Sequence, residues 1–96
     1  MARKKQPEKK QFSDRFPARE SAILKCLADN VRELREECGL SQEALADAGE
    51  IQQTEISKIE NRRSNPTILT LERLALAFGV TVPDLLQPGA VKKRKS

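Results

Sequence analysis

Hydrophobic residues recur at helical spacing in the first part of the region between residues 21 and 86. Five of them follow one another at steps of three and four residues: Leu24, Leu27, Val31, Leu34 and Cys38. That spacing places them on one face of an amphipathic helix. Gly39 stands where the left-handed residue that ends many helices is expected. The pattern predicts a first helix that stops just before Gly39.

Two shorter helices are predicted next. Ser41 is a residue type that caps helix N-termini, and it precedes a short stretch of helical periodicity, Gln42–Ala48. After the break at Gly49 and Glu50, a third helix is marked by its isoleucines, Ile51, Ile56 and Ile59. The connection is too short for a strand, so the pattern predicts a helix, a tight turn and a second helix.

A fourth helix and a final turn complete the pattern. Thr67 can cap a helix over Ile68–Phe78, and Gly79 is placed to end it. Its apolar face is expected to comprise Leu71, Leu74, Ala75 and Phe78. A last turn over Val82–Leu86 is expected to direct Leu85 and Leu86 inward. No alternating run predicts a strand, so the fold class is all-α with five helices.

The charge is unevenly distributed along the 96 residues, whose net charge is +4. Residues 1–20 carry seven cations against three anions, and residues 87–96 carry four cations and no anion. The stretch 21–86 holds seven cations and eleven anions, so it is acidic. We interpret residues 1–17 as a flexible basic arm, residues 18–87 as the folded domain and residues 88–96 as a basic tail that begins at Pro88-Gly89.

Composition excludes several classes of function. The chain has no His, Trp or Tyr, which excludes histidine acid–base catalysis and most zinc sites. No nucleophile–base constellation indicates an enzyme, and no cofactor or metal site is expected. The chain has no apolar run near the length of a membrane span and no secretory signal. Its two cysteines define no disulfide framework, so a cytoplasmic protein is expected.

The third helix carries the most specific chemistry. Opposite Ile56 and Ile59, one arc collects the polar residues Thr54, Ser57, Lys58 and Asn61, while Gln53 projects from the first turn. Amide, hydroxyl and ammonium groups of this kind read base edges in duplex DNA, and Arg62 and Arg63 suit phosphates. A polar arc is also what any solvated helix face presents. The preceding short helix and tight turn favour the DNA-binding interpretation.

Several separated motifs make the chain similar to a known family. They are Gln-Glu-x-Leu-Ala from Gln42, Ile-Ser-x-Ile-Glu from Ile56, Asn65-Pro66 and Asp-Leu-Leu from Asp84. In these residues, and over roughly residues 22–87, the chain resembles the Cro/C1-type (XRE family) helix-turn-helix regulators. The resemblance implies a compact lambda-repressor-like DNA-binding domain in a bacterium or its phage, and therefore a protein associated with the nucleoid.

The resemblance also implies roles for individual positions. Gln42 matches a glutamine that contacts a phosphate and often braces a second glutamine, here Gln53. Arg35 and Glu60 match an ion pair between the first and third helices, which is structural first. Base-reading candidates are Gln52, Gln53, Thr54, Ser57 and Lys58, and phosphate-binding candidates are Gln42, Asn61, Arg62 and Arg63.

One position departs from the family pattern. The family usually has glycine where this chain has Glu50, and Gly49 comes one residue early. Either Glu50 adopts a positive φ at a cost of about 1 kcal/mol, or the turn shifts by one residue. Either outcome would affect the register of Gln52 and Gln53.

Two functional hypotheses follow. The first is a transcriptional regulator that reads a near-palindromic operator as a homodimer, with the tails adding general affinity. Its dimer interface is expected at Val80, Val82, Leu85 and Leu86, with Ile23 and Leu24 as a second candidate surface. The second hypothesis is an antitoxin-type module whose acidic domain binds a basic toxin. Restriction–modification controller, prophage repressor and antitoxin remain open alternatives.

Overall fold

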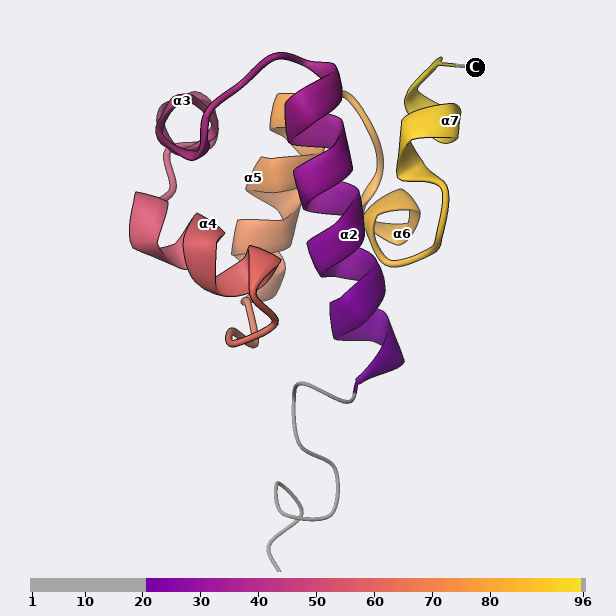
Figure 1. Ribbon diagram of the computed structural model, residues 1–96, viewed down its shortest axis with the longest axis horizontal. Helices are drawn as coiled ribbons and strands as arrows, with labels where there is room; N and C mark the ends of the chain where they lie inside the picture. The colour runs from indigo at the N-terminus through magenta and orange to yellow at the C-terminus, as the bar shows by residue number, and fades with distance from the viewer. Residues whose placement is uncertain (1–20, 96) are drawn as a thin grey trace, which may run out of the picture.

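The computed structural model describes residues 21–95. This part of the chain forms six helices and no strand (Figure 1). The helices are α2 (Ala22–Glu37), α3 (Gln42–Gly49), α4 (Gln53–Glu60), α5 (Ile68–Phe78), α6 (Val82–Leu85) and α7 (Ala90–Lys95). The predicted all-α class is confirmed, but the predicted number of five helices is wrong. The arm predicted over residues 1–17 lies outside the described residues.

Local capping chemistry sets the helix boundaries. The side chain of Ser21 accepts a hydrogen bond from the Leu24 N–H at 3.1 Å, and Ser41 accepts from the Ala44 N–H at 3.0 Å. Thr67 caps α5 in the same way, at 3.1 Å from the Thr70 N–H. Gly39 and Gly79 follow the ends of α2 and α5 at φ values of 70° and 73°. Each cap satisfies backbone groups that a helix end leaves unpaired, so these boundaries follow from local sequence.

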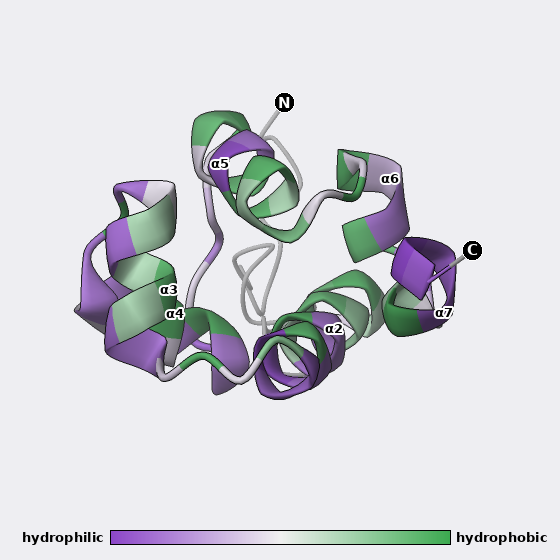
Figure 2. Cartoon of the chain, turned by 90° about the horizontal axis from the view of Figure 1, so that it is seen from above, coloured by the Kyte–Doolittle hydropathy of each residue, from purple (hydrophilic) through white to green (hydrophobic). Residues whose placement is uncertain are grey.

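One hydrophobic core joins α2 to α6. Figure 2 shows α2 and α5 on opposite sides of it, α3 and α4 at one end, and α6 and α7 at the other. Its largest fully buried side chains are Leu27, Leu34, Leu45, Ile56, Leu74, Phe78 and Leu85. The predicted α5 face is confirmed, because Leu71, Leu74, Ala75 and Phe78 are all buried. None of the described helices is long and apolar enough to cross a membrane.

The C-terminal basic residues are part of the fold. Residues 90–95 form α7, which packs against α2 and α6, so the expectation that the fold ends at Pro88-Gly89 is wrong. Gly89, at φ 89°, allows the chain to reverse, and Ala90 is fully buried. The Arg94 side chain donates to the Phe78 carbonyl at 2.9 Å, and Lys95 pairs with Glu37 at 3.1 Å.

A buried asparagine holds this end of the chain. Asn30, 2% exposed on α2, donates from Nδ2 to the carbonyl oxygens of Leu85 and Gln87 at 2.8 and 2.6 Å. Its Oδ1 accepts from the Ala90 N–H at 3.3 Å. A single amide thus satisfies backbone groups at the end of α6 and the start of α7.

Helix α6 is only four residues long, and a capping box compensates for this. The Thr81 side chain accepts from the Asp84 N–H, and the Asp84 carboxylate accepts from the Thr81 N–H at 3.1 Å. Hydrogen bonding of the Asp84 carboxylate to Thr81, first to its backbone N–H and then to its side-chain hydroxyl, holds the pKa of Asp84 below its ordinary value.

We predict that Asn30→Ala lowers the free energy of unfolding by about 2 kcal/mol, because it leaves buried carbonyl groups without a donor. It should also expose the α7 lysines to trypsin in the native state. Urea unfolding and limited proteolysis measure the two effects. Asn65→Ala is the matched control, since Asn65 is exposed and its side chain makes no hydrogen bond within residues 21–95. Equal effects of the two substitutions would contradict the role given to Asn30.

Candidate nucleic-acid interface

Helix α4 separates a buried face from a polar exposed face. Ile56, Ile59 and Glu60 are at most 5% exposed and lie against the core. The polar candidates lie on the other side: Gln52, Gln53, Thr54, Lys58 and Asn61 are exposed, and Ser57 is half-buried. The structure therefore brings the predicted base-reading residues together along one helix and its N-terminal end.

The turn before α4 resolves the question raised by Glu50. Only residues 50–52 separate α3 from α4, and Glu50 adopts φ 55° and ψ 47°, so the turn is not shifted. Gly49 remains helical and buried, where an added Cβ would lie 3.0 Å from Ile51 Cδ1. A side chain at position 49 would therefore need Ile51 to shift by a few tenths of an ångström, while Glu50 bears the left-handed conformation.

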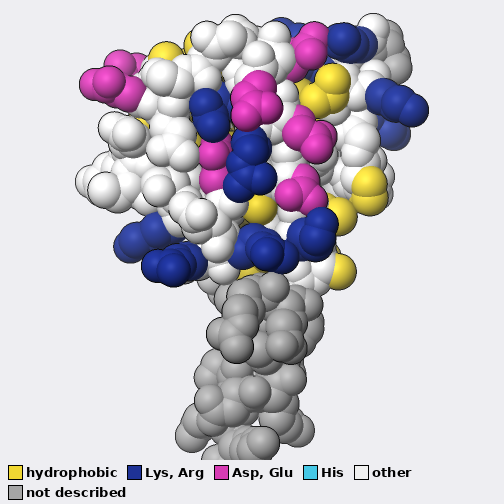
Figure 3. Space-filling view, in the orientation of Figure 1, with side chains coloured by type: hydrophobic (Ala, Val, Ile, Leu, Met, Phe, Trp, Pro, Cys, Tyr) yellow, Lys and Arg dark blue, Asp and Glu magenta, His cyan; other side chains and the backbone are white. Residues whose placement is uncertain are grey.

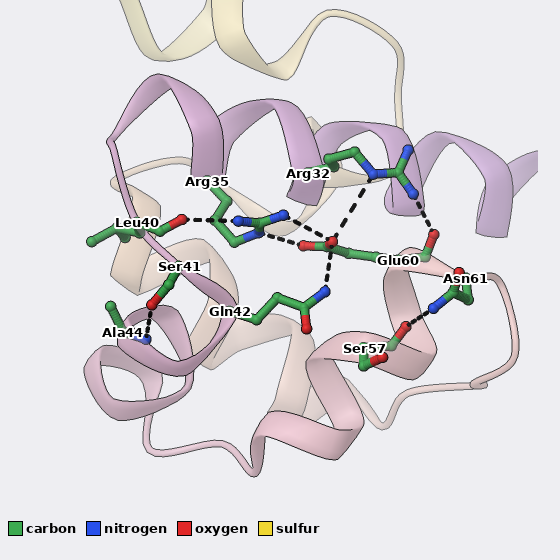
Figure 4. A network of polar contacts seen from close by, with 9 residues as sticks. All are labelled: Arg32, Arg35, Leu40, Ser41, Gln42, Ala44, Ser57, Glu60 and Asn61. Atoms are coloured by element: carbon green, nitrogen blue, oxygen red, sulfur yellow. Dashed lines mark hydrogen bonds and ion pairs between the residues drawn. The ribbon is translucent and has the colours of Figure 1, made fainter.

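The buried carboxylate of Glu60 joins three helices (Figure 4). Arg35 on α2 donates from Nε to Oε2 at 2.7 Å and from Nη2 to Oε1 at 3.2 Å. Gln42 on α3 donates from Nε2 to Oε1 at 3.0 Å. The hydrogen bond with Glu60 is the main reason that the pKa of Arg35 is raised above its ordinary value. The expected ion pair is present, and it orients α4 against α2.

Gln42 is used differently from the expectation. Its amide is bonded to Glu60, and no hydrogen bond links it to Gln53 among the described residues. Gln42 is half-buried at the start of α3. Its bond to Glu60 fixes the start of α3 to the end of α4.

Arg32 is a contributor that sequence reasoning missed. Its Nη2 donates to the Glu60 carbonyl at 2.8 Å, and its Nε lies 4.0 Å from Glu60 Oε1. The side chain is 43% exposed, so this cation both caps the C-terminus of α4 and remains at the surface. Arg32 lies three residues before Arg35 on the same face of α2, and this spacing is the sequence feature that could have identified it as a second partner of Glu60.

The chain leaves α4 through a second left-handed residue. Asn61 donates from Nδ2 to the Ser57 carbonyl at 2.8 Å, which commits one of its donors to the helix end. Arg62 has φ 59°, and the Arg63 N–H donates to the Lys58 carbonyl at 2.8 Å. This is the hydrogen bond of a Schellman motif, formed without glycine. Arg62 is half-buried and Arg63 is exposed.

The other acidic residue of α4, Glu55, is bonded to the loop that follows the helix. Glu55 is half-buried and accepts a hydrogen bond from the Ser64 hydroxyl, in the loop that leads to α5. Both residues border an open hollow of about 510 Å³ with Pro66 and Arg73. The carboxylate thereby ties α4 to this loop.

The basic side chains are divided between two parts of the surface. In Figure 3, Lys and Arg side chains line the lower edge of the described domain, where the loop after α4 lies in Figure 1. Helix α7, with its four cations, packs on the side of α2 away from α3 and α4 (Figures 1 and 2). Within one protomer, α7 and α4 therefore present their charges on different sides of the domain.

The four residues expected at a dimer interface have different surroundings. Leu85 is 0% exposed inside the single chain, so its assignment to an interface is wrong. Val80, Val82 and Leu86 are half-buried and pack against the core.

Comparison with known proteins places this geometry in a family. Residues 31–85 match the helix-turn-helix family model. The HTH-type transcriptional regulator DdrOP3 of Deinococcus deserti is 43% identical over 61 residues, which are 64% of this chain and 47% of that protein. The control protein C.SmaI of Serratia marcescens is 38% identical over 76% of this chain and 87% of its own length. The chain belongs to the Cro/C1-type helix-turn-helix transcriptional regulators.

A solved structure supports the lambda-repressor-like fold of this Cro/C1-type regulator. The restriction–modification controller C.Esp1396I, crystallised as a tetramer in complex with its natural 35 base-pair operator, has a TM-score of 0.63 and 29% identity. The match covers 80% of this chain and all of that one. The predicted family and fold are confirmed, and the family consists of regulators of transcription, not enzymes.

We predict that Glu50→Gly stabilises the Cro/C1-type domain by roughly 0.5 kcal/mol. Glycine removes the steric cost of a left-handed residue with a side chain, which is about 1–2 kcal/mol. Glycine also makes the unfolded chain more flexible, and this offsets about 0.5–1 kcal/mol of that gain. Chemical denaturation measures the difference. Glu43→Gly, inside α3, is the control and should destabilise the domain. Destabilisation by both substitutions would contradict the strain assigned to position 50.

We predict that Arg35→Ala lowers the free energy of unfolding by about 3 kcal/mol, because it leaves the buried Glu60 carboxylate without its main partner. The double variant Arg35→Met/Glu60→Leu should be more stable than Arg35→Ala, since it removes both charges. Arg63→Ala, at an exposed site, should change stability by less than about 0.5 kcal/mol. If Arg63→Ala costs as much as Arg35→Ala, the network does not have this role.

Proposed function

We propose that this protein is a sequence-specific regulator that reads a near-palindromic DNA operator as a homodimer. The observation that carries the proposal is the exposed polar face of α4, held at a fixed angle by the buried Glu60 network. A single recognition helix reads only a few base pairs, so pairing of two copies doubles the site. Binding to an operator would also place the protein on the nucleoid.

The α4 residues have distinct proposed roles. Gln52 and Gln53, at the N-terminal end, lead the helix into the major groove, and their amides suit adenine. Thr54 and Lys58 read base edges from the exposed arc, Lys58 by donating to guanine. Ser57 is half-buried and has the shortest reach of the five. Exposure together with side-chain length thus gives Lys58 and the two glutamines the largest proposed share of specificity.

Phosphate contacts are proposed around both ends of the motif. Gln42 and Asn61 each keep one amide hydrogen outside the hydrogen bonds described above. Arg62 and Arg63 follow α4 directly, in the loop before α5. Contacts of this kind set the register of the protein on the duplex and carry no sequence information.

Similarity to C.Esp1396I supports this proposal, because that controller is crystallised with its operator as a tetramer. Selection of bound duplexes from a random library tests it directly. A spaced palindrome supports a dimeric reader, and a single half-site contradicts the homodimer. Recovery of no sequence contradicts specific DNA binding and favours the antitoxin-type alternative.

We predict that Lys58→Ala lowers affinity for the selected operator about 5- to 150-fold for each half-site, in line with the roughly 1–3 kcal/mol of a base contact, and relaxes selection at one position of each half-site. Competition binding against operator and random duplexes measures both effects. The matched control is Lys93→Ala on α7, which should leave operator preference unchanged. Unchanged preference in Lys58→Ala would contradict its base-reading role.

A further inference from the structure

Three of the largest exposed hydrophobic side chains belong to α5. Ile68, Leu69 and Leu76 are 68%, 55% and 84% exposed. The opposite face of the same helix is fully buried in the core. Figure 2 views α5 end-on and shows it at the edge of the bundle, between the α3–α4 end and α6. No described element covers these leucines.

The outward face of α5 has an ordered arrangement of charge. Leu69 and Leu76 lie seven residues apart, so they form one line about 10 Å long along the helix. Glu72 and Arg73 lie between them and project about 50° to either side of that line. Both are exposed. Glu72 has no ion-pair partner within residues 21–95, and Arg73 donates only to the Glu50 carbonyl, at 3.0 Å.

We infer that a second copy of this chain packs on this face, with the two α5 helices side by side and running in the same direction. Leu69 and Leu76 then contact the partner's Leu69 and the partner's Leu76. On each flank, Glu72 of one protomer meets the partner's Arg73. This inference rests on the proposed homodimer and assigns its interface to α5, in place of Val80, Val82 and Leu86.

Symmetry decides the direction of the two helices. A two-fold axis parallel to α5 places the Glu72 flank of one helix against the Arg73 flank of its partner. A two-fold axis perpendicular to both helices makes them antiparallel and sets Glu72 against the partner's Glu72 and Arg73 against the partner's Arg73. Like charges that face each other oppose association, so the parallel arrangement is the complementary one.

Space beside Leu76 also suits this packing. An open hollow of about 320 Å³ lies next to it, bordered by the small residues Ala48, Gly49 and Ala77 and by the charged residues Glu50 and Arg73. Small side chains on that border allow a neighbouring leucine to approach closely. An apolar anchor beside a hollow, flanked by paired charges, is the usual composition of a specific interface.

The parallel arrangement has a consequence for DNA. Residues 61–67 join the C-terminal end of α4 to the N-terminal end of α5, and in Figure 1 the two lie at the same end of the domain. An axis along α5 therefore keeps both α4 helices at the same end of the dimer, where one duplex can contact both. The antiparallel arrangement would place them at opposite ends.

Charge exchange in the full chain tests the pairing. Glu72→Arg should raise the dimer dissociation constant about 30-fold, because arginine at position 72 then faces the partner's Arg73 on both flanks; this corresponds to about 2 kcal/mol. The double variant Glu72→Arg/Arg73→Glu should return the constant to within about 3-fold of the original, since each flank regains a complementary pair. Glu43→Arg on α3 is the control and should have no effect. Sedimentation equilibrium measures all four proteins, and a double variant as weak as Glu72→Arg would overturn the pairing.

Leucine substitutions distinguish this inference from the proposed function. Leu76→Asp should yield a monomer that keeps its helical circular dichroism, while Ile23→Asp, at another exposed hydrophobic site, should stay dimeric. A dimeric Leu76→Asp variant would overturn the α5 interface and leave the homodimer intact. An unsubstituted chain that is monomeric at tens of micromolar, with and without operator DNA, would overturn the homodimer itself.

Disulfide trapping tests the direction of the helices. In a Cys26→Ala/Cys38→Ala background, Leu76→Cys protomers should cross-link to one another under mild oxidation. A mixture of Leu69→Cys and Leu76→Cys protomers of different mass should yield only same-position cross-links. Preferential cross-linking between positions 69 and 76 would show the antiparallel arrangement and overturn the inference.

Discussion

The buried carboxylate of Glu60 is the contact on which the orientation of the exposed face of α4 depends. It lies at the C-terminal end of α4 and binds Arg35 of α2 and Gln42 of α3, so it sets the positions of three helices at one point. Hydrophobic packing alone lets a short helix roll or slide, because apolar contacts have little directional preference. Directional hydrogen bonds to the buried Glu60 carboxylate restrict that freedom. They therefore also fix the direction in which the exposed side chains of α4 point.

Much of the fold could be predicted because its signals are local. Ser41, Thr67 and Gly79 cap or end their helices through bonds that span only a few residues, and the apolar stripes of α2 and α5 follow the helical period. Helix α7 could not be predicted in this way. Its anchor is Asn30, whose bonds span 55 to 60 residues, and only the tertiary fold reveals that Ala90 has a place to be buried.

The candidate site likewise has a part that local sequence predicts and a part that depends on how the helices pack. The polar arc of α4 follows from the spacing of Ile56 and Ile59, so its members could be predicted from sequence. The bonds of Gln42 and Arg32 to Glu60 could not, because they depend on how three helices meet. Leu85 was misplaced for a related reason: a hydrophobic residue near the end of a small domain suits an interface or a core equally well, and only the packing of α6 distinguishes them.

Two left-handed residues, Glu50 and Arg62, bracket α4, and neither is glycine. The turns before and after the helix are stabilised by packing and by backbone hydrogen bonds. Among the side chains of the exposed arc, only that of Asn61 takes part in either turn. The side chains proposed for recognition and the atoms that hold the fold are therefore largely different parts of the same eight-residue segment. If the proposed function holds, exchange of the exposed side chains for those of a relative would change the operator without any redesign of the core.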